Sequence, residues 1–476
     1  MSLEITVVLL GLAVLLADLW MAPERRRALG YASAAIVGIL LLNTFDSHSG
    51  TVFGSAAGGM FVQDALSIFF KRLFLLATAM VLILAVEFSD RITAGVSEYY
   101  SLIIFALAGM LFAASSNNFV MLFVSIELIT VTFYVLTSFS RGKVASLEAG
   151  VKYLILGALS SAFMVYGIAL VWGTTGKFSF TELAQVAGDY SQNKVFLTGV
   201  LFILAGLGFK IAAFPFQMWT PDVYQGAPTP TTAFLAIGSK AAGFVLLLRF
   251  LFTAIPAITD HWSNLLIVIS AITILYGNLC AIPQRNLKRL LGYSSIAHAG
   301  YLLMGVAALT SAGQAAVMYY LGGYLFTTIA AFAVIVLVMR HLDSEDIGGL
   351  AGLSRRSPLL ALTLTLAMVS LAGLPPLAGF FGKFLLLKAI IEQGPANHGY
   401  YWLAFTALAG VVISLYYYFG VIRAVYFSKE GADAAPLEIS RPAQFVLGVC
   451  ILGIFWLGLF PGAVLDFATE AAQVLR

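Results

Sequence analysis

The sequence is poor in charged residues. Asp, Glu, Lys and Arg together make up 10% of the 476 residues, whereas 61% are hydrophobic; ordinary soluble domains carry about a quarter charged residues. A soluble fold could not cover so many apolar side chains with a surface that water wets. The composition therefore predicts a protein whose main solvent is lipid.

Other absences exclude several kinds of site. Cys280 and Cys450 are the two cysteines, too few for a cysteine-held iron–sulfur cluster or a disulfide framework. No segment is typical of a strand, so no glycine-rich dinucleotide motif follows one. The basic residues are scattered and the net charge is +3, which gives no sign of a nucleic-acid partner. We expect the chain itself to bind no metal and no cofactor.

Long apolar runs fill the chain. A membrane-spanning helix needs about 20 mainly apolar residues, and the sequence offers fourteen such candidates with no room for a soluble domain. They cover residues 3–21, 29–44, 65–88, 99–114, 118–139, 148–173, 195–216, 229–252, 263–281, 290–309, 313–340, 358–388, 401–427 and 442–465. The sequence thus predicts an all-α polytopic membrane protein with about 14 transmembrane helices. The first segment lacks a basic n-region and is interpreted as a retained helix.

Lys and Arg in the connections predict the orientation, because cytoplasmic loops are enriched in them. With the N-terminus outside, fourteen basic residues fall in inside loops and four in outside loops. The inside set is Arg25, Arg26, Arg27, Arg91, Arg141, Lys143, Arg285, Lys288, Arg289, Arg340, Arg355, Arg356, Lys429 and Arg441, and the outside set is Lys177, Lys194, Lys388 and Arg476. Both termini are therefore predicted on the non-cytoplasmic side.

A short repeated pattern indicates internal duplication. Ala-Gly-Leu at 205–207, followed by Pro215, resembles Ala-Gly-Leu at 372–374, followed by Pro375 and Pro376. The two patterns lie five helices apart, and a five-helix unit reverses its topology when it is repeated. Helices 4–8 and 9–13 are then an inverted pair. The predicted units are residues 1–98, 99–253, 262–428 and 441–476, which hold helices 1–3, the two repeats and helix 14.

Four charged residues fall deep inside these helices: Glu127, Lys210, Lys240 and Lys383. A charge at the bilayer centre costs about 2.5–3.5 kcal/mol. Buried ion pairs that hold helices together are one explanation, but three lysines face a single acid. The lysines without an acid must be hydrated, paired with a neighbouring subunit, or uncharged for part of the time. The last option is proton exchange, because burial favours neutral lysine and a nearby carboxylate favours the charged form. Movement of Glu127 relative to Lys210 could therefore control whether that lysine holds its proton.

His298 and three prolines accompany these charges. His298 is the one histidine of five at membrane depth, which suits a proton relay or a hydrogen-bonded packing role. Pro215 follows Lys210 by five positions, and the pair at 375–376 precedes Lys383 by seven. Prolines inside helices free backbone carbonyls, and a broken helix beside an ionisable group is typical of a transport site, although either break alone could be a kink.

The other basic residues near helices are expected to reach the membrane interface with their side chains. They are Lys71, Arg72, Lys152, Arg249 and Arg423. The Gly- and Pro-rich segment 219–230 is expected to be an ordered turn, with Asp222 as a cap or loop residue.

Several motifs resemble one family. They are Phe209–Phe216 (FKIAAFPF), Trp219–Pro230 (WTPDVYQGAPTP), Gln284–His298 (QRNLKRLLGYSSIAH) and Ser370–Phe384. These segments resemble the antiporter-like membrane subunits of respiratory complex I, an NADH:quinone oxidoreductase. Among these subunits, the chain resembles subunit N in its length and in having a lysine at position 383. The resemblance covers nearly the whole chain.

The resemblance implies a proton-translocating, non-redox subunit of a bacterial inner-membrane translocase with two inverted five-helix repeats, each with a discontinuous helix. It implies that Glu127 and Lys210 gate proton input and that Lys240 connects the repeats. It also implies that His298 lies on the central axis and that Lys383 ends the path. NADH, FMN, iron–sulfur clusters and quinone would belong to other subunits, and the partners would be neighbouring membrane-arm subunits and lipid.

Two alternatives share the buried charges. One is a cation/proton antiporter subunit of a multi-subunit sodium-tolerance complex or a hydrogenase-type complex, and the other is a structural scaffold without conduction. The sequence of residues 219–230 and the lysine at 383 favour the respiratory complex.

Overall fold

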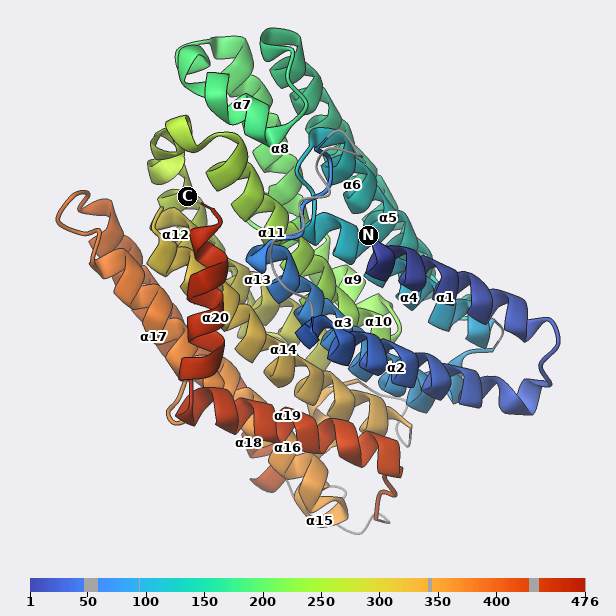
Figure 1. Cartoon of the computed structure of the whole chain (residues 1–476). Coiled ribbons are helices and arrows are strands. Elements are labelled where there is room, and N and C mark those ends of the chain that lie inside the picture. The colour runs from blue at the N-terminus through green and yellow to red at the C-terminus, as the bar shows by residue number, and fades with distance from the viewer. Residues whose placement is uncertain (47–58, 94, 341–344, 428–435, 476) are drawn as a thin grey trace.

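A computed structural model describes residues 1–46, 59–93, 95–340, 345–427 and 436–475. Within these ranges the chain is helical, and its β-pairing is limited to three isolated bridges (Figure 1). This outcome follows from the composition, because lipid offers no hydrogen bonds and an α-helix satisfies its own backbone groups.

The helices alternate along the chain with short connections. Their bounds are α1 Ser2–Asp18, α2 Arg26–Asn43, α3 Ala65–Phe88, α4 Val96–Ala114, α5 Phe119–Thr137, α6 Val144–Thr175, α7 Phe180–Val186, α8 Lys194–Ile211, α9 Thr220–Gly226, α10 Thr229–Phe234, α11 Lys240–Arg249, α12 Ser263–Ala281, α13 Leu287–Ala307, α14 Ser311–Met339, α15 Leu353–Arg356, α16 Pro358–Ala372, α17 Ala378–Ile391, α18 Gly399–Phe427, α19 Arg441–Leu459 and α20 Gly462–Gln473. Two π-helical turns, Leu235–Ser239 and Phe250–Ala254, flank α11.

The predicted set of spans is confirmed. Twelve helices of the described chain are long and apolar enough to cross a membrane. The two remaining predicted spans correspond to α1, which has 17 residues, and to the pair α16 and α17, which share the run predicted over 358–388.

Both predicted helix breaks are present. Helix α8 ends at Ile211, and Ala212 adopts a left-handed conformation with φ 61°. Helix α16 ends at Ala372, and Gly373 takes φ 88°. The expectation of a span to residue 216 was wrong, because the helix stops before Pro215. The segment 219–230 is also more ordered than a turn, since α9 occupies Thr220–Gly226 with Pro221 in its first turn, where a proline suits a helix.

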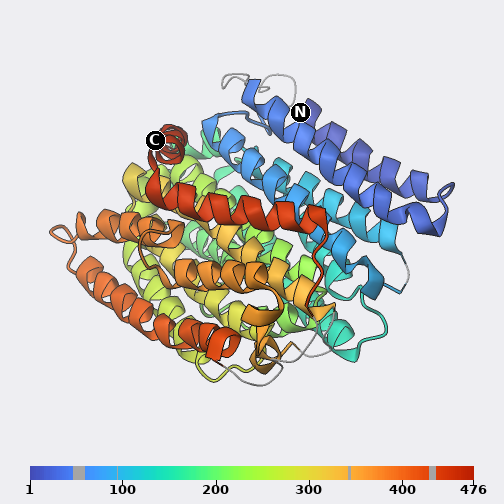
Figure 2. The ribbon, with the colours of Figure 1, turned by 90° about the horizontal axis from the view of Figure 1, so that it is seen from below.

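Equivalent helices of the two predicted repeats pack in equivalent pairs. In the first repeat α4 packs on α5, and α6 packs on both α8 and α9. In the second repeat α12 packs on α13, and α14 packs on both α16 and α17. Helices α9 and α13 join the two halves. Seen from below, α1 and α2 lie along one edge of the bundle and α18 lies along the opposite edge (Figure 2). The exact limits of the repeats stay a prediction.

The C-terminal segment differs from its prediction. The run predicted over 442–465 is two helices, because α19 ends at Leu459 and Pro461 precedes α20. Helix α20 turns away from the end of α19 and runs at a steep angle to it (Figure 1). It packs against α14 and α3.

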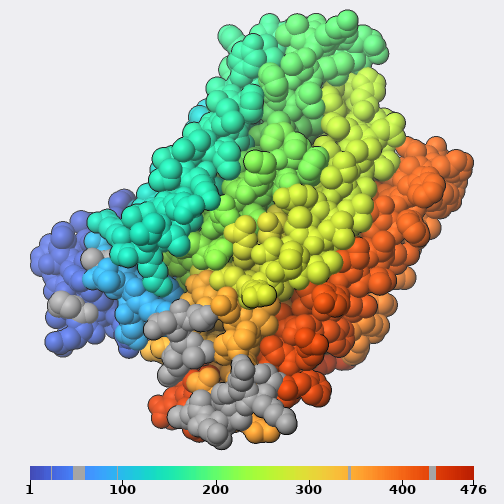
Figure 3. Space-filling view, turned by 180° about the vertical axis from the view of Figure 1, so that it is seen from behind, coloured from blue at the N-terminus to red at the C-terminus, as the bar shows by residue number. Residues whose placement is uncertain are grey.

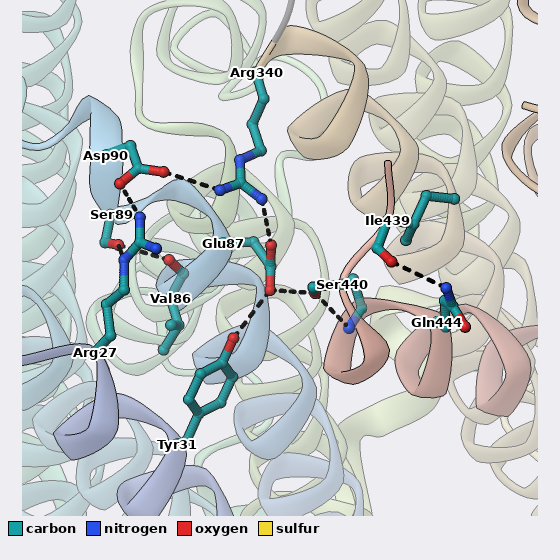
Figure 4. A network of polar contacts seen from close by, with 11 residues as sticks. Arg27, Tyr31, Val86, Glu87, Ser89, Asp90, Arg340, Ile439, Ser440 and Gln444 are labelled. Atoms are coloured by element: carbon teal, nitrogen blue, oxygen red, sulfur yellow. Dashed lines mark hydrogen bonds and ion pairs between the residues drawn. The ribbon is translucent and has the colours of Figure 1, made fainter. Parts of the chain in front are cut away.

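One face of the molecule gathers connections that are distant in sequence. Glu87 at the end of α3 accepts hydrogen bonds from Arg340 after α14 (2.6 Å), Tyr31 of α2 (3.0 Å) and Ser440 before α19 (2.5 Å). Next to Glu87, the Asp90 carboxylate forms ion pairs with Arg27 and Arg340 (Figure 4). The positive-inside pattern assigned these connections to one side, and they do meet.

The same face continues to the α12–α13 connection. Lys288 pairs with Glu345 at 2.8 Å, and the Ile347 amide donates to the Arg285 carbonyl at 2.9 Å. We call this side, with Arg27, Arg285 and Arg340, the basic face. Lys429 and Arg476 lie outside the described residues.

Candidate functional site: a buried row of lysines between two broken helices

The predicted site residues occupy the interior of the bundle. Lys210, Lys240, His298 and Lys383 are 6%, 2%, 2% and 4% exposed, whereas Glu127 is half-buried. The four buried residues come from α8, α11, α13 and α17. Each buried side chain has polar partners, which is what the cost of desolvation requires.

Lys210 lies in the last turn of α8, directly before the first break. Its ammonium donates a hydrogen bond to the Thr130 hydroxyl of α5. Glu127, one turn earlier on α5, accepts a hydrogen bond from Ser161 of α6. Within the described chain Glu127 and Lys210 form no ion pair within 4.0 Å. The carboxylate and the ammonium are therefore held by separate hydroxyl groups on neighbouring turns of one helix.

Lys240 begins α11, directly after the π-helical turn Leu235–Ser239. Such turns insert a residue into a helix and often mark functional sites. The Lys240 ammonium donates to the Ser295 carbonyl at 2.5 Å and to the Ser295 hydroxyl. The Ser295 hydroxyl also lies 3.0 Å from the Tyr224 hydroxyl. Lys240 is thereby connected to α13 and to α9, the second half of the first broken helix.

His298 uses both ring nitrogens. Nδ1 hydrogen-bonds the Tyr320 hydroxyl of α14, and Nε2 lies 3.1 Å from the Tyr418 hydroxyl of α18. The Tyr418 hydroxyl is also 2.5 Å from the Ser294 hydroxyl. A neutral imidazole has one N–H donor and one acceptor, so a proton arriving at one nitrogen can leave from the other. The Tyr324 ring completes this cluster, 5.1 Å from the His298 ring.

Lys383 lies in the second turn of α17 and reaches back across the second break. Its ammonium donates to the carbonyls of Leu371 (2.8 Å) and Ala372 (3.1 Å), which end α16. It also lies 4.7 Å from the centre of the Tyr301 ring. The C-terminal end of a helix carries partial negative charge and unpaired carbonyls, so it stabilises a cation. A Cβ on Gly373 would come within 2.9 Å of Lys383 Cδ, and the residue has φ 88°, so a larger residue here would be strained and would displace the lysine.

Sequence reasoning missed the partners of these residues. Hydroxyl groups of Thr130, Ser295, Tyr320 and Tyr418 hold three of them, and backbone carbonyls hold Lys383. The serines next to His298 were visible in the sequence, but tyrosines spread over apolar helices gave no signal. Counting acids against lysines likewise ignored carbonyl oxygens as partners.

Ion pairs occur at the periphery of the site. Arg249 is buried within the protein, and its guanidinium binds the Asp64 carboxylate at 2.8 and 3.0 Å and the Ala114 carbonyl at 2.9 Å, both at helix ends. Lys71 pairs with Glu4 at 2.7 Å. Asp64 also caps α3 by accepting from the Ser67 amide, and an Asp three residues before a Ser was the available signal.

Asp222 is more than a cap. It pairs with Lys152 of α6 at 2.8 Å and with Arg289 of α13 at 2.5 Å. Through these pairs α9 is fixed to both halves of the bundle. Across the described residues no group of three or more His, Cys, Asp or Glu side chains could hold a metal ion.

Equivalent packing around two broken helices, with buried lysines at both breaks, is typical of antiporter-like membrane proteins. A family described as "NADH:quinone oxidoreductase/Mrp antiporter, TM" matches residues 116–414. NADH-quinone oxidoreductase subunit N of Desulforamulus reducens is 41% identical over 99% of this chain and 97% of its own length. The chain belongs to the family of NADH-quinone oxidoreductase subunit N, as its motifs predicted.

Solved structures agree with this assignment. A chain of respiratory complex I from Thermus thermophilus has a TM-score of 0.80 and 34% identity, covering 98% of this chain and 99% of that one. A chain of the Mrp complex from Dietzia shares the fold with a TM-score of 0.81 at 21% identity, covering 100% of this chain and 98% of that one. The antiporter alternative is thus a related family of the same fold.

Proposed function

We propose that the chain is a proton-translocating membrane-arm subunit of a bacterial NADH:quinone oxidoreductase. One observation carries the proposal: four buried titratable side chains, each held by polar partners, extend from the first broken helix to the second. Hydride and electron chemistry would take place on other subunits, which would hold NADH, FMN, the iron–sulfur clusters and quinone. Neighbouring membrane-arm subunits and lipid would surround this chain.

The roles follow from the partners. When the Glu127 carboxylate approaches Lys210, it stabilises the ammonium, since an opposite charge nearby favours the charged form. When the carboxylate stays hydrogen-bonded to Ser161, Lys210 loses its proton more easily. Lys240 receives the proton beside Ser295, and His298 relays it between Tyr320 and Tyr418. Lys383 stores it against the carbonyls that end α16. We further propose that the protein lies in the inner membrane with the basic face toward the cytoplasm and both termini on the other side.

The decisive experiment is Lys210→Met in membranes of the native host, with assembly of the complex verified by native electrophoresis. Methionine is similar in side-chain length to lysine but has no ammonium group to carry a proton. We expect NADH-driven proton uptake and coupled NADH oxidation to fall together. Lys194→Met, on an exposed residue at the start of the same helix, serves as the matched control and should leave both unchanged.

Each result has a consequence. Loss of proton uptake alone would mean a real path that is uncoupled from the redox step. If both activities stay normal and only sodium tolerance suffers, the protein is an antiporter. If nothing changes, the chain is a scaffold.

A further inference from the structure

We infer that a polar branch connects Lys383 to the basic face through the seam between α12 and α18. The inference rests on the proposed function, because it assigns the branch to the same protons. Helices α12 and α18 pack side by side, and from behind they run next to each other along the surface (Figure 3). Lys383 is thus not confined to the row of lysines.

A cavity opens the branch at the basic face. Its volume is about 370 Å³, and its lining includes Gln284, Leu290, Tyr417 and Arg423. Liquid water occupies about 30 Å³ per molecule, so the cavity has room for several waters. Arg423 is exposed and has no hydrogen bond or ion pair with the described residues. The lining therefore combines apolar residues with the polar side chains of Gln284, Tyr416 and Tyr417 and the positive charge of Arg423.

Polar side chains continue inward from the cavity. Tyr417, 4% exposed, donates its hydroxyl proton to Asn278 Oδ1 at 2.9 Å. Asn278 is fully buried in α12, and its amide nitrogen donates to the Ile274 carbonyl at 2.9 Å. That bond uses one of its two N–H donors, and the second is available to the Tyr301 hydroxyl, which itself donates to the Ala407 carbonyl at 3.3 Å.

Gly410 keeps the next step open. A Cβ at Gly410 would meet the Tyr301 hydroxyl at 2.7 Å and Asn278 Nδ2 at 2.9 Å. These two polar atoms therefore lie side by side at Gly410, next to the Ile274 Cγ2 methyl, which would be 2.5 Å from the same Cβ. The Tyr301 ring in turn lies 4.7 Å from the Lys383 ammonium. Tyr417, Asn278 and Tyr301 thus form a series of polar groups that can hold water between the cavity and Lys383.

The branch moves protons and nothing else. A hydronium at the cavity gives its proton to the water chain, and neutral Lys383 takes a proton from the other end to become the ammonium. The amide of Asn278 positions the water and keeps its own protons. The same route in reverse would release a proton to the basic face, so the branch allows exchange rather than fixing direction.

Cysteine accessibility tests the branch directly. In a Cys280→Ser, Cys450→Ala background, Asn278→Cys is treated with a small membrane-impermeant thiol reagent from the basic face of membranes that hold the assembled complex. We expect labelling of this chain, and no labelling from the opposite face. Leu266→Cys, buried about three turns away on the same helix, should stay unlabelled. Labelling only from the opposite face, or none, would overturn the branch.

Proton transport gives a second readout. Tyr417→Phe keeps the ring but leaves the Asn278 oxygen without its donor, and we expect proton uptake to slow about tenfold, the scale of one lost buried hydrogen bond. Gly410→Ala should slow it by closing the gap. Tyr401→Phe, exposed at the far end of α18, is the control. If uptake is normal in both variants, the branch is wrong.

The two proposals fail separately. A complex with Lys210→Met that pumps normally overturns the proposed function, even if Asn278→Cys is labelled. A complex in which Lys210→Met fails to pump while Tyr417→Phe and Gly410→Ala pump fully overturns the branch alone.

Discussion

Each of the two broken helices has a buried lysine, but the two lysines are stabilised by different hydrogen-bond partners. At the first break Lys210 lies before the interruption and hydrogen-bonds a side-chain hydroxyl, with Glu127 one turn away from that hydroxyl. At the second break Lys383 lies after the interruption and hydrogen-bonds two main-chain carbonyls. Side-chain partners can change rotamer, whereas the carbonyls ending a helix are fixed. The first site is built to switch and the second to hold.

The surroundings of the two breaks also differ in polarity: they are apolar at the first break and more polar at the second. The cavity beside the first break, about 470 Å³, is lined by apolar residues that include Phe163, Phe214, Pro215 and Phe216. The second break instead faces Tyr301 and, beyond it, Asn278. Water avoids apolar cavities and needs two to four polar partners. Lipid or empty space suits the first cavity, so exchange with water along a seam is expected only at the second break.

The largest effect is expected from Lys383→Met. The variant removes the ammonium and leaves the Leu371 and Ala372 carbonyls buried without a donor, at about 1–3 kcal/mol for each. We expect a loss of proton uptake of at least about tenfold, with a lower melting temperature of the purified complex. Lys388→Met, one turn later and exposed, is the control. Retained uptake would show that the path ends before Lys383.

The next effect concerns the carboxylate, which only the first site has. In Glu127→Gln the amide oxygen still accepts from Ser161, so assembly should be normal. The negative charge that favours protonated Lys210 is gone, and we expect proton uptake to fall about tenfold, as for about 1.4 kcal/mol. Proton uptake per NADH oxidised in native membranes measures this, with Glu148→Gln on exposed α6 as the control. Normal proton uptake would show that Glu127 does not control the protonation of Lys210.

The sequence contained the charged residues of the site but not their partners. Lys210, Lys240, His298 and Lys383 stand out because each interrupts an apolar run, and a buried charge needs a reason. Their partners are carbonyls at a helix end and hydroxyls from other helices, and such contacts appear only after the chain is folded. The partner of Arg249 was missed for the same reason, since its carboxylate, Asp64, lies far away in the sequence.

The fold was predictable because lipid imposes simple rules. Apolar length fixed the spans, and the positive-inside pattern grouped connections that meet around Glu87 (Figure 4). Breaks at proline were located only within a few residues. A helix can stop before a proline, as α8 does at Ile211, and a short helix can start at one, as α9 does beside Pro221. Which of these occurs depends on packing against α6 and α13.

The smallest effects compare the residues with positive φ at the two breaks. Gly373→Ala places a Cβ at φ 88° and 2.9 Å from Lys383 Cδ, so backbone strain of about 1–2 kcal/mol adds to a displaced lysine. We expect a lower melting temperature and slower proton uptake. Ala212→Gly at the first break relieves similar strain at φ 61° but loses a buried methyl worth about 0.8 kcal/mol. Both properties should therefore stay near those of the unchanged complex, because the two small effects oppose each other. If Ala212→Gly impairs uptake as strongly as Gly373→Ala, the backbone at both breaks positions the proton carriers equally, and the distinction between a switching and a holding site is lost.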